Sequence, residues 1–381
     1  MNRHPYPPPE APVPRAGRRA ILLLPPALLA APAHAAPDDA ILRALNRALV
    51  EQVVLPGYRR FTSVTANLTA RLDALSRAPG EAQALESARQ GFADTLLAWE
   101  GVQHIRSGPA DLFSRHARIQ LWPDPQDRVS QDLERAIAQR DTSLLEIRST
   151  ALNAVSVQGL PALERLLFGE GAAEALAAGD AGAGYRAALL RAIGGNLAAL
   201  GRDLLAGWTG GEAPHAVALA EPRAPYATPQ DATLDLLRAL HAAVAAVADR
   251  KLGPALGAGP AEARPKALEC WRSRLSGQAI RANVDAAAAM VLQGFAPALD
   301  SSGEGALAAT LRQACAELQR IAGSLPLPLE DAIQHEAERE LPLRLQGEAA
   351  ALKVMLAQRV PPPLGLSGIA EPLENAANPP P

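Results

Sequence analysis

Apolar residues recur three and four positions apart through most of this 381-residue chain. In one stretch the spacing runs 3-4-4-3, through Phe61, Val64, Leu68, Leu72 and Leu75. This spacing places apolar side chains on one face of an α-helix, and its repetition is typical of helix bundles. Only 3% of the residues are aromatic, whereas the strands of sandwiches and barrels are rich in aromatic and β-branched residues. We therefore predict an all-α protein.

Segments rich in glycine and proline divide the predicted helices into groups. Pro56-Gly57 is expected to end the first helix, and a helix is expected at 143–157, where Ser143-Leu-Leu-Glu146 forms a capping box. Residues 212–228 contain several prolines and are expected to link two helical-bundle domains, at 36–211 and 229–360. A signal peptide is expected at 1–35. The tail, 361–381, is expected to be disordered because of its composition.

The N-terminus has the pattern of an export signal. A basic segment with Arg15, Arg18 and Arg19 precedes a short apolar run, and Ala33-His34-Ala35 is an Ala-x-Ala cleavage site. We expect cleavage near Ala35 and a soluble protein of the periplasm or cell envelope, without a later transmembrane segment. The general secretory and twin-arginine routes both remain open. Loss of the signal changes the net charge from −3 to −6, which argues against a nucleic-acid partner.

The chain has two cysteines, Cys270 and Cys315. Export permits a disulfide. However, antiparallel packing of the predicted helices would separate the two positions by about 22 Å along the helix axis. Two buried thiols are the favoured reading, and a disulfide is the alternative.

The stretch from Gly159 to Gly169 has the pattern of a short helix and contains a glutamate among apolar residues. Gly159 ends one helix, and Pro161 suits the first turn of the next because its missing N–H is not needed there. Glu164 then falls within an apolar run. A carboxylate in that position must be hydrogen-bonded, ion-paired, metal-bound or turned to water. We expect Glu164 to be at least partly buried and bound by arginine or backbone donors, with a solvated side chain as the alternative.

This stretch resembles the imelysin family, cell-envelope proteins that were once grouped with metallopeptidases. The family signature is Gly-x-His-x-x-Glu, followed by a Leu-Leu-Phe-Gly-like tail. Here Gly159, Glu164 and the tail Leu166–Gly169 match, whereas Pro161 replaces the histidine. The resemblance implies two helical bundles and an iron-type site, but the site lacks its most diagnostic donor.

Two further segments carry the resemblance, which extends over about residues 40–366. The first has Trp99, a Gly-Pro break and then Arg118 with Trp122-Pro123-Asp124. We expect Trp122 to fill a packing gap and Asp124 to accept N–H groups or cap a helix, with a purely structural loop as the alternative. The second is a turn rich in serine, arginine and glycine before Ile280-Arg281-Ala282-Asn283, which could bind an anion or cap a helix.

Few residues qualify as metal ligands. By the motif, Glu164 is the only candidate. Glu100 and His104 are four apart on one helix face, and could join Glu164 in a cluster of two carboxylates and one histidine. His335 and Glu338 form a second His-x-x-Glu, in a charged run typical of an exposed face.

The sequence carries no positive evidence for catalysis. It contains no His-Glu-x-x-His, no Gly-x-Ser-x-Gly and no phosphate-binding loop. The resemblance implies a binding protein in iron uptake or metal handling, whose partners would be envelope iron-uptake or redox proteins. A metallopeptidase and a degenerate paralogue acting as a structural or interaction module are the two alternatives.

Overall fold

The computed structural model describes residues 38–146, 152–212 and 214–369, and in these ranges it contains helices and no strand. The all-α prediction is confirmed. The predicted signal peptide lies outside the described residues. None of the described helices combines the length and the hydropathy needed to span a bilayer.

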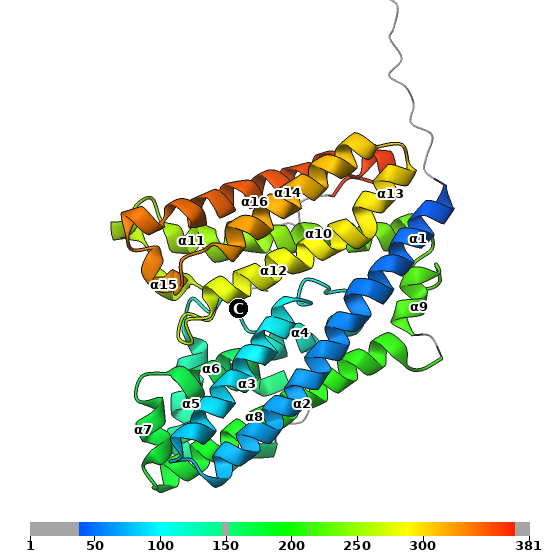
Figure 1. The fold of residues 1–381 in the computed structure, drawn as a ribbon. Coiled ribbons are helices and arrows are strands. Elements are labelled where there is room, and N and C mark those ends of the chain that lie inside the picture. The colour runs from blue at the N-terminus through cyan, green and yellow to red at the C-terminus, as the bar shows by residue number, and fades with distance from the viewer. Residues whose placement is uncertain (1–37, 147–151, 213, 370–381) are drawn as a thin grey trace, which may run out of the picture. The chain divides into compact units, whose positions relative to one another are not determined.

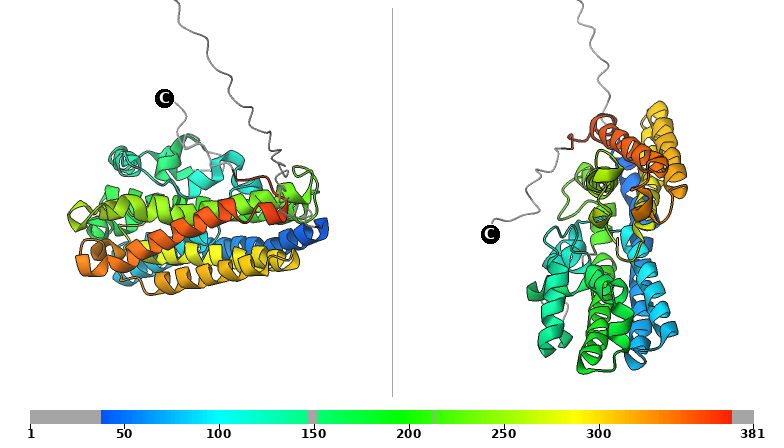
Figure 2. Two further views of the ribbon diagram at one scale, coloured as in Figure 1. Left: turned by 90° about the horizontal axis from the view of Figure 1, so that it is seen from above. Right: turned by 90° about the vertical axis from the view of Figure 1, so that its left-hand side faces the viewer.

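Two groups of long helices make up the fold (Figure 1). The first comprises α2 (Leu55–Arg77), α3 (Ala82–Glu100), α6 (Gly159–Phe168) and α8 (Ala181–Thr209). The second comprises α10 (Pro229–Ala245), α12 (Ser276–Met290), α14 (Gly305–Gly323) and α16 (Glu340–Gln358). In the right-hand view of Figure 2, the second group lies above the first. Helix α3 of the first group packs against α12 of the second.

Shorter helices connect and flank these groups. They are α1 (Asp39–Leu49), α4 (Arg115–Ile119), α5 (Arg128–Gln139), α7 (Ala172–Ala177), α9 (His215–Ala220), α11 (Gly253–Leu256), α13 (Ala296–Ser301) and α15 (Leu329–Ala332). Helix α1 contacts α10 and α13, whereas its continuation α2 packs on α3 and α8. One helical rod therefore contacts both groups.

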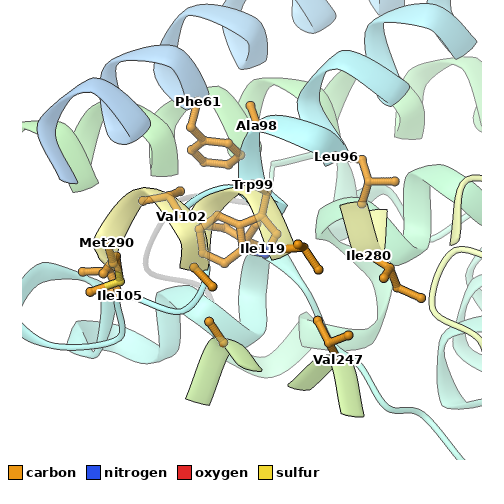
Figure 3. Packing of buried hydrophobic residues seen from close by; sticks show 14 of the residues in the cluster. Phe61, Leu96, Ala98, Trp99, Val102, Ile105, Ile119, Val247, Ile280 and Met290 are labelled. Carbon is orange, nitrogen blue, oxygen red and sulfur yellow. The ribbon is translucent and has the colours of Figure 1, made fainter. Parts of the chain in front are cut away.

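The buried apolar side chains of both groups belong to one cluster. Trp99 of α3 is fully buried at their junction, with its ring 5.1 Å from that of Phe61. Ile280 and Met290 of α12, and Val247 of the π turn that follows α10, belong to the same cluster (Figure 3). Burial of a large aromatic side chain is among the strongest single contributions to a core.

Pro56-Gly57 does not end the first helix, contrary to the pattern. A π-helical turn, Val50–Val54, joins α1 to α2, and the N–H of Leu55 bonds to the carbonyl of Val50. Similar π turns at 246–252 and 291–295 precede Pro254 and Pro297. The wider turn accommodates a residue that lacks an N–H, so the helix continues past the proline.

The α-helix expected at 143–157 is also wrong, because the described residues of this stretch form 3-10 turns. The described parts of this stretch form 3-10 turns at Thr142–Glu146 and Leu152–Val157, and residues 147–151 lie outside the described ranges. The backbone N–H and hydroxyl of Ser143 donate to the Asp141 carboxylate, at 3.0 and 2.6 Å. Ser143 therefore does not form the expected capping box, because a local Asp turn competes with the helix.

The segment at 212–228 contains α9, which contacts α1, α8 and α10 and is therefore packed onto the fold. The predicted domain boundaries stay a prediction. The tail departs from its expectation at its start, because Pro362–Leu364 is a 3-10 turn and Leu364 is buried. Residues 370–381 lie outside the described part. Cys270 and Cys315 are free buried thiols, as expected.

Candidate functional site

Gly159 begins α6, as the sequence predicts, and no other residue type fits its position. Its φ is +74°, a left-handed conformation that side chains disfavour. A Cβ atom there would lie 2.4 Å from the carbonyl oxygen of Ile119 and 2.5 Å from that of Arg118. The glycine thus lets α6 start directly against the chain that leads to Trp122.

Glu164 lies one turn into α6 and is 6% exposed. One carboxylate oxygen accepts the backbone N–H of Ser273 at 2.9 Å and the Ser273 hydroxyl at 2.7 Å. Burial raises the pKa of Glu164, while these hydrogen bonds and the nearby charge of Arg272 act in the opposite direction. The expectation of a buried carboxylate met by a backbone donor is confirmed.

Ser273 belongs to a bent loop, residues 268–275, between the helices of the second group. Cys270 and Arg274 in this loop have positive φ angles of 62° and 59°. Residues in this region carry backbone strain that the surrounding structure must hold in place. The bonds from Ser273 to Glu164 provide such a restraint, and they join α6 to the loop.

A buried ionic network lies behind the loop. The Lys251 ammonium is 2.6 Å from the Glu100 carboxylate and 2.5 Å from that of Glu269, and all three side chains are almost fully buried. Asn283 donates to Glu100 at 2.7 Å, and Gln120 donates to Glu269 at 2.5 Å. The network therefore ties α3, α12 and the loop together.

Two carboxylates share one ammonium in this network. Burial, and then the charge of Glu269, raise the pKa of Glu100 to about 7, although Lys251 and Asn283 oppose the rise. Burial lowers the pKa of Lys251, but the two carboxylates outweigh it and the net shift is upward. Lys251 thus stays charged, and the pKa of Glu100 lies close to neutral pH.

A cavity of about 720 Å³ lies beside Glu164. Of the predicted site residues, Trp122, Asp124, Pro161 and Glu164 line it. Its other charged or polar lining groups come mainly from the loop and the adjoining chain, and include Glu269, Cys270, Trp271 and Arg272. The cavity therefore gathers the α6 motif, the Trp122 segment and the serine- and arginine-rich turn, which are three separate stretches of the sequence.

Asp124 and Arg118 serve the structure around this cavity. Asp124 accepts the backbone N–H of Val129 at 2.9 Å, and so caps the start of α5 as expected. Arg118 is fully buried and donates to Gln158 at 3.2 Å. Arg118 thereby braces the residue that precedes Gly159.

The cluster of Glu100, His104 and Glu164 does not form. The Glu100 carboxylate is bound to Lys251 instead. His104 is buried, its ring nitrogens have no hydrogen-bond partner among the described residues, and burial lowers its pKa to about 4. His335 and Glu338 are exposed.

The residues around Glu164 do not fit a transition-metal ion. Such ions need several nitrogen, oxygen or sulfur donors at converging positions. Pro161 offers no side-chain donor, and one oxygen of Glu164 is already bound to Ser273. Within the ranges that the structure describes, no three His, Cys, Asp or Glu side chains are grouped to hold a metal.

Sequence reasoning missed Lys251, Glu269 and the role of Ser273. Lys251 lies in an otherwise helical run, so its charge gave no reason to place it inside. The sequence predicts an anion site or a helix cap for the turn containing Ser273, but its donors bind Glu164. A glutamate within an apolar run, at Glu269-Cys270-Trp271, is the signal that could have revealed the network.

Comparison with known structures shows the same fold. A protein designated iron-regulated protein A precursor, from Parabacteroides distasonis, aligns with a TM-score of 0.70 and 16% identity over 84% of this chain and 95% of that one. An imelysin-like protein from Psychrobacter arcticum aligns with a TM-score of 0.68 and 18% identity over 87% of this chain and 98% of that one. No curated protein matches. The model of the imelysin family, peptidase family M75, matches residues 54–356, and the chain belongs to this family.

Proposed function

We propose that this chain is an exported binding protein of the cell envelope that serves iron uptake or metal handling without catalysing a reaction. The observation that carries the proposal is the position of Glu164, on a cavity wall with one carboxylate oxygen held by both donors of Ser273. A carboxylate bound in this way positions a loop. A general base or a metal ligand would have to use the other carboxylate oxygen, and among the described residues no three His, Cys, Asp or Glu side chains are grouped to complete a metal site.

The altered motif also supports a binding role. A hydrolytic metal centre keeps three protein ligands and one open position for water. In this chain the histidine of the family signature is replaced by Pro161, and Glu100 is committed to Lys251. Among the described residues there is therefore no set of metal-binding donors of the kind that the family's peptidase name implies.

The link to iron comes from the family and from the P. distasonis protein, which is designated iron-regulated. The proposed location comes from the signal pattern at residues 1–35. Envelope iron-uptake or redox proteins are the partners that such a protein would serve.

The direct test is deletion of the gene in its source bacterium, followed by growth with and without iron restriction. We expect a growth defect under iron restriction only, restored by the wild-type gene and not by Glu164→Ala. Periplasmic material should begin near Ala36 on N-terminal sequencing. Growth that does not depend on iron would favour a structural or interaction module instead.

The peptidase alternative has its own measurement. The purified mature chain is incubated with insulin B chain and zinc or ferrous ions, with and without a chelator. We expect no cleavage in either case. Chelator-sensitive cleavage that Glu164→Gln abolishes would replace the binding proposal with the metallopeptidase.

A further inference from the structure

Three cationic side chains on the wall of the cavity beside Glu164 form no ion pair with the described residues. Arg250, Arg264 and Lys266 all line it, and all are exposed. None of the three has an ion pair or a side-chain hydrogen bond to the described residues, although Lys266 stacks on an indole ring. Their charge is therefore available to a ligand.

The carboxylates of the same cavity are already bound. Five of them line it, so a count of charges alone would not favour an anion. Each has a donor or a cation in contact: Asp124 with the N–H of Val129, Asp127 with Arg272, Asp249 with Lys353, Glu164 with Ser273, and Glu269 with Lys251. The lining charges that have no ion-pair partner in the described part of the chain are therefore all positive.

Two indole rings accompany these cations. Trp122 and Trp271 both line the cavity. The Lys266 ammonium lies 5.3 Å from the centre of the Trp271 ring, and the Arg272 guanidinium lies 4.4 Å from it. Cation–π contacts at such distances hold long side chains in place. None of the aromatic ring pairs of the described residues includes Trp122, so its ring can pack on a planar group in the cavity.

We infer that the cavity binds a small anion that carries an aryl ring, such as a catecholate or its ferric chelate, and does not bind a bare metal ion. This inference rests on the proposed function and names its ligand class. The charges of Arg250, Arg264 and Lys266 bind the anionic oxygens, and Trp122 packs on the ring. A cavity of about 720 Å³ has the size of those that enclose a small organic ligand.

Glu164 is a positioning residue for this site. Its bonds to Ser273 fix the loop two residues from Trp271 and one from Arg272. The glutamate of the family motif thus acts on the ligand through the loop. Glu164→Gln keeps an oxygen acceptor for Ser273 and should retain binding, whereas Glu164→Ala should weaken it.

The test is a calorimetric titration of the mature full chain with four probes: 2,3-dihydroxybenzoate, its tris-chelate with ferric iron, ferric citrate, and ferrous ion alone. We expect the two aryl anions to bind, and ferric citrate and ferrous ion to bind at least about tenfold more weakly. The double variant Arg264→Glu with Lys266→Glu should lose about tenfold or more in affinity for the aryl anions, because attraction becomes repulsion. The double variant Arg59→Glu with Arg60→Glu, at two exposed arginines of α2 that do not line the cavity, is the matched control.

Each result decides between defined outcomes. Aryl binding that the double variant leaves unchanged, or no aryl binding by a folded wild type, would overturn the inference. Equal or tighter binding of ferric citrate or ferrous ion, lost in Glu164→Ala, would overturn the inference and leave the proposed iron role intact. Binding of the aryl anion together with growth that does not depend on iron would support the inference and contradict the proposed function.

Discussion

Arg250 and Lys251 are neighbours in one π turn, 246–252, and meet opposite environments. Lys251 is buried between Glu100 and Glu269. Arg250 lines the cavity with no ion pair to the described residues. Removal of a charge from water is costly unless the fold supplies a partner. Lys251 therefore stabilises the fold through its two ion pairs, whereas Arg250 is exposed and has no ion-pair partner among the described residues.

The largest test of this comparison is Lys251→Met. The change leaves the Glu100 and Glu269 carboxylates buried without their ammonium, so we expect a loss of about 3–5 kcal/mol in the free energy of unfolding. Arg250→Met is the control and should change stability by less than about 0.5 kcal/mol. Urea unfolding of both variants measures the difference. Similar losses of stability in Lys251→Met and Arg250→Met would show that the burial of Lys251 does not make its charge more important to the fold than the charge of Arg250.

A second test concerns the start of α6 beside the cavity. Gly159→Ala forces a side chain into the left-handed region, at a cost of about 1–3 kcal/mol, and against two carbonyl oxygens. Gly171→Ala is a matched control, because Gly171 has a φ of +68° and no atom near its absent Cβ. The control should lose only about 1 kcal/mol. Equal losses of stability in Gly159→Ala and Gly171→Ala on thermal unfolding would mean that the close approach of residue 159 to the carbonyl oxygens of Arg118 and Ile119 does not affect stability.

The third test uses pH to distinguish the network from its surroundings. Glu100 has its pKa raised from 4.5 to about 7, so the folded protein binds this proton more tightly than the unfolded chain. Its contribution to stability is complete below about pH 4.5 and is lost as pH rises through 7. The pKa of His104 is lowered from 6.5 to about 4, so its contribution to stability has the opposite pH dependence. That contribution is complete above about pH 6.5 and is lost as the pH falls through 4.

The comparison is therefore between wild type and Glu100→Gln, measured by urea unfolding at several pH values. The stability of the wild type relative to the variant should fall from pH 4.5 to pH 7. A difference that is constant or rises with pH would contradict a raised pKa at Glu100.

The sequence predicts those features of the fold that depend on a single helix. The 3-4 spacing predicted the helices, and Gly159 with Glu164 predicted a helix start with a buried acid. The predicted end of the first helix at Pro56 is wrong, because a π turn lets the helix continue past the proline. Lys251 and Glu269 meet across a loop, so the apolar run around Glu269 could mark a buried acid but could not identify Lys251 as its partner. The cavity could not be predicted for the same reason, because three separate stretches must pack before it exists.

The central claim is that Glu164 secures a loop beside a ligand cavity and does not hold a metal. Calorimetric titration with ferrous, ferric and zinc ions tests it in the mature wild type, in Glu164→Ala and in Pro161→His. We predict no binding of these ions by the wild type at micromolar concentrations, and a gain of affinity in Pro161→His, which restores the donor that suits these ions. Micromolar or tighter binding by the wild type that Glu164→Ala abolishes would contradict the account.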